Sequence, residues 1–512
     1  MQNKIIDKIQ PIIKTATGML ICLMVLPAYG QHRGDRLGFQ GLNSIENQGV
    51  KALAMGGAYT SIYGELEALY WNPAGLVGLS GLQVAVNAGS YKQSWNERQD
   101  YRPNRQLVTL SFILDGLYSP DPAYNGWWDN EAFLADSNYV VNEPVLGKDP
   151  YSEEAADWKK EMDGFGLHDL TFALPLTIMQ KSVVVSGGYS QQLLALDYDR
   201  NDTYLIPHPS SDVYNPISER VTSQQDSVHV EWYEFSRSRS GPLKAINAAL
   251  AVGVTDYLKV GIGFKHLSGE TDDTQSFNKV ANIEIKGGYN LFQFQYDTLN
   301  VITSGTSTFS GNTIEIGAIL NLKSLSIGAS VTPGYTIKRE WDYTVQTTDA
   351  NETISKTLSG TDEIKTPLSY SVGISLRPKE TITLSMDLER RPYEKAEWEI
   401  SPAAIGGDTI HTDWKNQTLF RVGAEYKPVS WLSILGGYQM IPAEYVPDGA
   451  AIKDKGPVTD LFSLGLSVGL MMGRLDITYQ FGDLKYYDQY FSNTNYVLKR
   501  FNNLMFGYTI ML

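Results

Sequence analysis

Met55-Gly56-Gly57-Ala58-Tyr59 is followed, after a short polar break, by Ala68-Leu69-Tyr70-Trp71-Asn72-Pro73-Ala74-Gly75-Leu76. Directly after this stretch the sequence turns into alternating strands and stays so to its last residue. Small residues such as Gly56 and Gly57 let backbones approach closely. Asn72-Pro73 is a strong turn signal, because proline fixes φ and restricts the residue before it. The stretch therefore predicts a compact folded segment that is neither a strand nor a long helix. An isolated Asn-Pro-Ala would indicate only a loop before a strand.

Residues 1–30 have the layout of a secretory signal peptide. Lys4, Lys8 and Lys14 precede an apolar core at 16–26, and small residues follow up to Gly30, where we expect cleavage. The apolar core is shorter than the roughly 20 residues that a membrane-spanning helix needs. The segment predicts export from the cytoplasm.

Charge and cysteine usage exclude several classes of function. The single cysteine, Cys22, lies within the predicted signal, so the mature chain would have no disulfide or thiol chemistry. The formal net charge is −15, and removing the signal, whose net charge is +2, leaves −17. Such an acidic chain is not expected to bind nucleic acid.

After the signal, no apolar run is long enough for a membrane helix. The nearest, Leu461 to Met472, has about 12 residues, too few for a span. Small or polar residues at Ser463, Gly465 and Ser467 alternate there with apolar ones, which is the period of a strand. If the protein lies in a membrane, it must form a closed barrel, because a barrel pairs every backbone polar group between strands.

Strand-like segments come in pairs joined by tight polar turns. They are Asp169 to Ile178 with Ser182 to Tyr198, Lys244 to Val254 with Leu258 to Leu267, Thr313 to Leu320 with Leu325 to Ile337, Pro367 to Leu376 with Thr381 to Leu388, Thr418 to Tyr426 with Trp431 to Met440, and Leu461 to Leu470 with Arg474 to Phe481. The connections between pairs, such as Arg200 to Gly241 and Gly269 to Gly311, are long and polar and are predicted to be loops. Short turns at one end and long loops at the other are typical of outer-membrane barrels.

The strand count is less certain than the architecture. Beyond the six pairs, Phe501 to Leu512, Gly81 to Tyr91 and Arg105 to Leu114 also alternate, whereas bacterial single-chain barrels normally have an even number of strands. A count of 16 would need a further strand between Val280 and Asp297. A soluble sandwich or propeller also has many short strands, but the signal peptide and the unequal connections favour the barrel.

The opening stretch resembles the N-terminal segment of the FadL/OMPP1/TodX family of outer-membrane channels for hydrophobic molecules, and of its relative PorV in type IX secretion. Thr418 to Tyr426, Leu435 to Tyr438 and Val446-Pro447-Asp448 are similar to the family's C-terminal half in residue type and order. The middle of the chain matches weakly, and surplus length lies in segments such as Tyr118 to Gly166. Phe506, Tyr508, Ile510 and Leu512 resemble the closing strand that the barrel assembly machinery recognises, although an aromatic end is more usual than leucine.

The resemblance implies an all-β transmembrane barrel of about 14 antiparallel strands at 81–512, with an N-terminal hatch, or plug, at 31–80 that contains Asn72-Pro73-Ala74. It implies a cell outer-membrane protein, surrounded by outer-membrane lipid, that takes up hydrophobic small molecules such as fatty acids or aromatic compounds. In the family the ligand leaves sideways through a gap at an inward-kinked strand. Gly187-Gly188 is our candidate for such a kink, and a small lumen-facing pair beside the plug is the alternative.

Trp127-Trp128 could capture a ligand in an outer loop, whereas most exposed aromatic residues would form girdles at the membrane interface. The competing function is that of PorV-like barrels, which hold secreted proteins instead of moving small solutes.

No enzyme, cofactor or metal site is predicted. His266 and Ser268 share a strand face and resemble the His-x-Ser of outer-membrane phospholipases, but Gly269 follows directly and the third, orienting group is not evident. The other histidines are scattered without ligand spacing.

Overall fold

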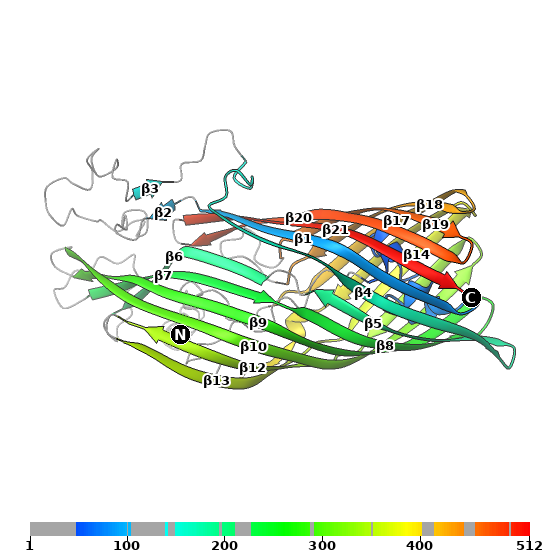
Figure 1. The fold of residues 1–512 in the computed structure, drawn as a ribbon, viewed down its shortest axis with the longest axis horizontal. Helices are drawn as coiled ribbons and strands as arrows, with labels where there is room; N and C mark the ends of the chain where they lie inside the picture. Colours follow the sequence, from blue (N-terminus) through cyan, green and yellow to red (C-terminus); the bar gives the residue numbers. More distant parts are fainter. Residues whose placement is uncertain are drawn as a thin grey trace, which may run out of the picture.

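The computed structural model describes residues 48–99, 101–103, 139–141, 149–193, 197–209, 227–286, 291–349, 352–401, 414–444, 456–490 and 493–512. Within this part of the chain, one antiparallel sheet closes into a barrel of 14 strands around a small N-terminal plug (Figure 1). The all-β barrel predicted from the sequence is thereby confirmed. No described helix is both long and apolar enough to cross a membrane.

Nine wall strands run without interruption and five consist of two segments. The uninterrupted strands are β1 (Gln83–Gln99), β4 (Trp158–Ile178), β9 (Leu258–Lys286), β10 (Leu291–Leu322), β17 (Gln417–Val429), β18 (Leu432–Pro442), β19 (Val458–Leu470), β20 (Gly473–Tyr490) and β21 (Asn493–Met511). The divided strands are β5 (Lys181–Leu193) with β6 (Asp197–Pro209), β8 (Pro242–Gly253) with β7 (Ser227–Ser240), β11 (Leu325–Thr332) with β12 (Thr336–Thr348), β14 (Ser369–Lys379) with β13 (Thr353–Lys365), and β15 (Ile382–Arg391) with β16 (Glu397–Glu399), η4 (Tyr393–Lys395) lying before β16. A separate pair consists of β2 (Tyr101–Pro103) and β3 (Tyr139–Val141).

The first and last wall strands form the seam of the barrel. β1 pairs with β21 from Gln83 opposite Met511 to Gln99 opposite Asn495. The predicted strand at Gly81 to Tyr91 is therefore the first wall strand, and it completes fourteen with the six pairs and the C-terminal strand. The segment Arg105 to Leu114, together with residues 1–47, lies outside the described residues.

Tight turns gather at the end of the barrel where the seam begins and the chain ends. The β4–β5 turn, for example, is formed by Met179 and Gln180, both with positive φ. Two adjacent residues in the left-handed region fit the twist of a two-residue hairpin. This end corresponds to the periplasmic end of an outer-membrane barrel.

The opposite end differs from the sequence-based expectation. Arg200 to Gly241 and Gly269 to Gly311 were predicted to be loops, and the described parts of both are largely strand. β9 and β10 continue far past the apolar part of the wall, paired up to Lys286 opposite Leu291. Their Thr, Ser, Asp and Gln residues suit strands that need no lipid-facing side chains. The region Val280 to Asp297 accordingly extends two existing strands and adds none.

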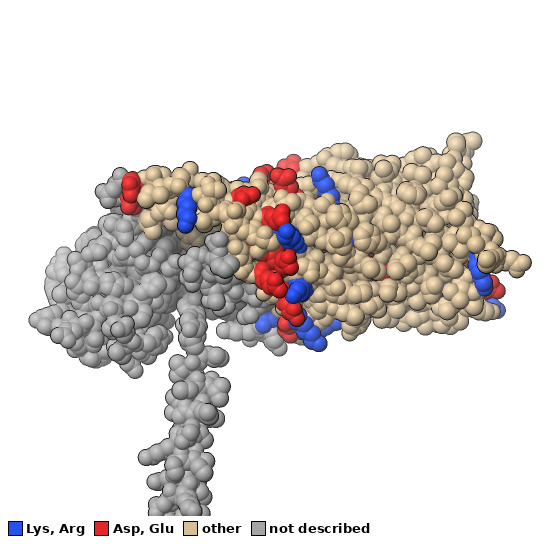
Figure 2. All heavy atoms as spheres, turned by 90° about the horizontal axis from the view of Figure 1, so that it is seen from below, with Lys and Arg blue, Asp and Glu red and all other residues tan. Residues whose placement is uncertain are grey.

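An apolar belt surrounds the end of the barrel that carries the tight turns. Outward-facing Ile262 and Phe264 of β9 are 48% and 46% exposed, and the next outward positions farther along include Glu270 and Asp272. Figure 2 shows a band of charged side chains across the wall and, from there toward the end with the tight turns, a surface almost without charge. Apolar side chains exposed on a closed barrel are those that face lipid.

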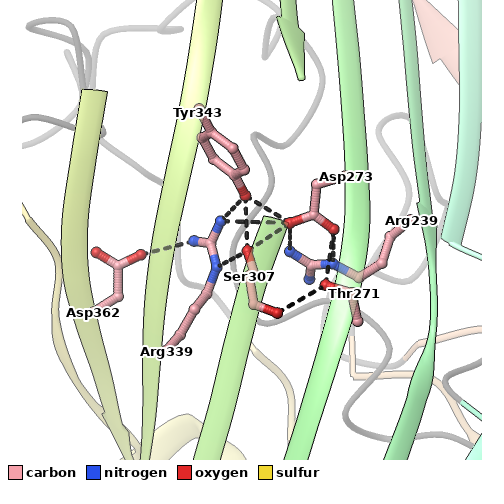
Figure 3. A network of polar contacts seen from close by, with 7 residues as sticks. All are labelled: Arg239, Thr271, Asp273, Ser307, Arg339, Tyr343 and Asp362. Carbon is pink, nitrogen blue, oxygen red and sulfur yellow. Dashed lines mark hydrogen bonds and ion pairs between the residues drawn. The ribbon is translucent and has the colours of Figure 1, made fainter. Parts of the chain in front are cut away.

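Beyond the belt, a network of buried charges on the inner face of the wall lies beside a small apolar cluster (Figure 3). The Asp273 carboxylate of β9 accepts hydrogen bonds from Arg239 Nε at 2.7 Å and Nη2 at 2.8 Å. Ser307 Oγ and Tyr343 OH each donate to it at 2.6 Å, and Thr271 Oγ1 donates at 3.0 Å. A single carboxylate thus connects β7, β9, β10 and β12.

A second arginine extends this network to the next strand. Arg339 of β12 donates from Nε to Ser307 Oγ at 3.0 Å and from Nη1 to Asp362 of β13 at 2.7 Å. Two arginines and two aspartates balance in formal charge, and the side chains of Arg239 and Asp273 are completely buried. The network fixes five adjacent strands to one another.

Replacing Asp273 by Asn should loosen this outer wall strongly. The change leaves the Arg239 guanidinium buried without its countercharge, and breaking a buried pair in this way typically costs about 3–5 kcal/mol. Hydrogen exchange in β7, β9, β10, β12 and β13 measures the effect.

Glu340→Gln is the matched control, because Glu340 pairs with Lys338 on the exposed outer face of the same β12. An exposed pair contributes about 0–1 kcal/mol, so exchange should hardly change. Equal effects of the two variants would show that the buried network does not hold the wall.

Candidate functional site: the plug and the break in the wall

The plug is a short chain segment folded inside the lumen. It contains α2 (Val50–Ala54), η1 (Leu66–Tyr70) and η2 (Pro73–Leu76), and Gly56 and Gly57 follow α2 with φ of 61° and 70°. Such angles favour glycine, which has no Cβ to clash with the following carbonyl. The glycines end α2 after little more than one turn and return the chain toward the wall.

The Asn72 side chain stabilises the plug and ties it to the wall. Its Oδ1 accepts the Ala74 N–H at 3.1 Å, which caps η2, and Pro73 takes the first helical position, where no N–H is needed. Its Nδ2 donates to Thr60 O at 2.7 Å and to Ala318 O of β10 at 3.4 Å. Asn72 thus joins two parts of the plug and the barrel wall through one fully buried amide.

Small residues on the wall let the plug backbone lie directly on the strands. A Cβ at Gly56 would lie 2.6 Å from the Tyr438 nitrogen of β18, and a Cβ at Gly261 of β9 would lie 2.5 Å from the Ala74 nitrogen. A Cβ at Gly57 would meet the ring of Trp71 at 2.5 Å. The residues of the predicted hatch motif therefore lie at the contact between plug and wall.

A buried cluster of charges joins α2 and η1 to the far wall. Glu65 accepts from Lys51 Nζ at 2.6 Å and from Arg474 Nη1 of β20 at 2.9 Å. Arg474 also contacts Asp476 at 2.8 Å, and Lys51 lies 3.4 Å from Glu425 of β17. Although burial acts to raise the pKa of the Glu65 carboxyl, Lys51 and Arg474 hold it well below its ordinary value.

Glu67 has a different role in the same cluster. Its carboxyl oxygens accept the N–H groups of Lys51 at 3.0 Å and Ala52 at 2.5 Å, so that Glu67 supplies the missing cap of α2. Burial, followed by the negative charge of Asp476, raises the pKa of Glu67 to about 8. This cluster could not be predicted from the sequence, because only the fold brings its members together.

The wall opens on one side of the plug. Within the described strands, β4 and β5 pair from Ile178 opposite Lys181 to Asp169 opposite Ser190, and no further pairing is recorded on this edge of β4. β5 stays paired with β8 up to Leu193. Upstream of Asp169, β4 remains paired only with β1 and runs apart from β6 (Figure 1).

The part of this edge nearest to Asp169 lies within apolar surface, whereas the exposed residues Asp163 and Glu161 farther along are charged. Phe165 of β4, four residues beyond the last rung, is 72% exposed, and Leu167 is 40% exposed. Apolar side chains at an unpaired strand edge indicate an opening toward lipid, because an edge facing water needs none. The β4–β5 pairing therefore ends in a part of the wall that carries exposed apolar side chains.

Gly187 and Gly188 lie on β5 close to this break. They stand opposite Phe172 and Thr171 of β4, in a stretch whose register is regular with both neighbouring strands. A Cβ at Gly188 would lie 3.1 Å from the Tyr70 hydroxyl of the plug, so this residue faces the lumen. A kink at Gly187-Gly188 remains a prediction.

Trp127 and Trp128 lie outside the described residues. His266 is on the outer face of the wall, where its Nδ1 lies 2.9 Å from Asn312 Oδ1 of β10, a partner 46 residues away that the sequence did not reveal. The structure gives His266 no bond to Ser268, which a nucleophile and base would need. Among the described residues no group of His, Cys, Asp or Glu is arranged to hold a metal.

Similar folds occur among solved channel structures. The chain matches a Pseudomonas aeruginosa FadL homologue with a TM-score of 0.55 and 11% identity, covering 91% of this chain and 99% of that one. It matches the toluene transporter TodX of P. putida with a TM-score of 0.54 and 12% identity, covering 91% and 99%. For the monoaromatic hydrocarbon channel CymD the TM-score is 0.51, with 10% identity and 91% and 98% coverage. No protein-family model and no curated protein sequence matches the chain.

These matches confirm the predicted resemblance to FadL and TodX at the level of the fold, over nearly the whole of each compared chain. Two of these solved structures carry names of transport proteins, the toluene transporter TodX and the monoaromatic hydrocarbon channel CymD. The barrel with its apolar belt is an outer-membrane type of wall.

The raised pKa of Glu67 predicts that alkaline pH loosens the plug. A carboxyl whose pKa is higher in the folded plug than in the unfolded chain stabilises the plug fully at pH below its ordinary value, and this contribution is lost as the pH rises through about 8. Between pH 6 and pH 9 the loss is about 2.7 kcal/mol, because the contribution falls by about 1.4 kcal/mol for each pH unit up to about pH 8. Hydrogen exchange of α2, corrected for the intrinsic pH dependence, measures it.

Glu67→Gln is the control, since its amide stays neutral at both pH values. The pH dependence should disappear in this variant. If it persists unchanged, another group is responsible.

Proposed function

We propose that this protein takes up hydrophobic small molecules across the outer membrane, with a lateral exit into the lipid. The observation that carries the proposal is the end of β4–β5 pairing at Asp169 and Ser190, within apolar surface and beside the plug. A water-filled pore needs no break in its wall. An apolar solute, in contrast, gains free energy by leaving the lumen directly into lipid.

The position of the plug supports this route. Plug residues contact walls on opposite sides of the lumen, from Gly261 of β9 to Tyr438 of β18, so the plug spans the lumen at their level. A solute that enters from the outer end therefore meets the plug before it could reach the periplasmic end. The break in the wall offers an exit at the side, provided that the plug yields there.

The neighbouring folds support the chemical class of the ligand. TodX is named as a toluene transporter and CymD as a monoaromatic hydrocarbon channel. We therefore propose aromatic hydrocarbons or long-chain fatty acids as candidate ligands, with outer-membrane lipid as the receiving phase. The predicted capture site at Trp127 and Trp128 belongs to this proposal and awaits its own test.

Tethering the plug to the wall should stop uptake. A Cβ built at Gly507 of β21 would lie 3.2 Å from Val50 Cβ in α2, close to the roughly 3.5–4.5 Å between the Cβ atoms of a disulfide. The Asn87 amide has to rotate to make room for the new side chain. Cells carrying Val50→Cys together with Gly507→Cys should take up labelled oleate and toluene after reduction but fall to near background when oxidised.

The two single-cysteine variants control for the substitutions themselves. Uptake that continues through the oxidised double variant would show that the plug need not move at α2. A purified wild-type barrel that binds neither probe but retains a secreted protein would instead favour the PorV-like role.

A further inference from the structure

β4 has an irregularity at the point where its pairing with β5 ends. Asn87 of β1 pairs with Asp169, whereas the next residue, Ala88, pairs with Leu167, so that His168 is an extra residue in the strand. Both His168 and Asp169 are buried, although neighbours in a regular strand point to opposite faces. This β-bulge aims Asp169 into the lumen at the base of the break.

The Asp169 carboxylate joins three parts of the molecule there. It accepts the N–H of Gly49, at the start of the described plug, with 3.2 Å between Gly49 N and Asp169 Oδ2. Its Oδ1 accepts from Asn87 Nδ2 of β1 at 2.7 Å and from Thr171 Oγ1 of β4 at 3.2 Å. All three partners are donors, and Asp169 has no exposed surface.

A second plug contact lies at the same place. The Tyr70 hydroxyl of η1 is 2.5 Å from Thr171 Oγ1, two residues along β4 from Asp169. Gly188 of β5 stands opposite Thr171 and leaves room for the tyrosine, because a Cβ there would lie 3.1 Å from its hydroxyl. The plug is therefore hydrogen-bonded to the last paired rungs before the wall divides.

We propose that Asp169 is a positioning residue that couples the plug to the lateral break: the path beside the plug is shut while Gly49 is bound to Asp169 and opens when this bond is released. The proposal rests on the proposed transport function for its biological meaning, but not for its geometry. Asp169 does not touch a ligand. It acts through the plug backbone, through β1 and through β4, whose outer half borders the break.

A second aspartate provides an internal comparison. Asp387 of β15 is also buried and accepts a plug N–H, from Thr60 at 2.7 Å. Around Asp387, however, β15 is paired without a shift to both β14 and β17, so the wall there is unbroken. Asp387 therefore binds the plug at an unbroken part of the wall. Asp169 binds the plug and also lies where the β4–β5 pairing ends.

The test uses two Asp169 variants and one matched control in the full-length protein. Asp169→Ala removes the acceptor, and Asp169→Asn keeps its shape but turns an N–H₂ toward donors. Asp387→Ala removes the corresponding acceptor at the unbroken wall. Each is combined with Ser190→Cys, which places a reporter at a buried lumen-side position on the last rung between β4 and β5. The one natural cysteine of the sequence, Cys22, lies in the predicted signal.

Labelling of this reporter by a water-soluble maleimide measures the opening, and uptake of labelled oleate and toluene is measured in parallel. Both Asp169 variants should raise the labelling rate by about tenfold or more, as expected for losing a hydrogen bond to a charged acceptor. Uptake should rise with it. The labelling rate of Asp387→Ala should stay close to that of the protein carrying Ser190→Cys alone. Folded barrels are selected beforehand by their heat-modifiable migration on gels.

The outcomes separate the two proposals. Unchanged labelling in Asp169→Asn, the variant that keeps the packing, would overturn the coupling, as would equal labelling in Asp387→Ala, because the plug would then be loosened generally. Raised labelling without any uptake, in a wild type that also takes up neither probe, would support the coupling and overturn the transport function.

Discussion

A strand inside a membrane must have its backbone N–H and C=O groups paired, because lipid offers no replacement for water. The barrel satisfies this requirement by closing β1 against β21 and by continuous registers between most neighbours. The edge of β4 upstream of Asp169 departs from the requirement while still carrying exposed Phe165. The unpaired backbone groups of such an edge need other neighbours than a strand. The plug is bound directly beside this edge, through Gly49 and Asp169.

The plug itself is held by two kinds of interaction. Glycines at the contact let its backbone rest on the wall, which explains the small residues at both Gly56 and Gly261. Buried carboxylates then fix its direction, since Glu65 reaches Arg474 on one side and Asp169 accepts from Gly49 on another. Buried apolar side chains such as Leu53 and Tyr59 complete this close packing, while a few polar bonds determine where the plug is attached to the wall.

The sequence predicted the architecture well, because alternation and turn length are local properties. The paired strands, the compact segment with Asn72 and the end with tight turns all follow from patterns within about ten residues. The count of fourteen was implied by the family resemblance, because alternation alone also marked Arg105 to Leu114. The outer extension was missed, since Thr, Ser and Asp in β9 and β10 read as loop when no lipid imposes alternation. The bulge at His168 and the partners of Asp169 could not be predicted, because Gly49 and Asp169 are 120 residues apart. Likewise Asn312 becomes the partner of His266 only through the register of β9 with β10.

The seam has a consequence for biogenesis. The plug precedes β1 in the chain and ends beside the seam, where a Cβ at Gly81 would collide with the backbone of Leu512. β1 pairs with β4 on one edge, but its other edge has no partner until β21, the last described strand, is present, so the cylinder cannot close before β21 has been made. The plug backbone contacts opposite walls of the barrel. A barrel that had already closed would therefore leave little space for the plug to enter. We therefore expect the plug to be in place before β1 and β21 pair, so that the sheet curls around the plug and then closes.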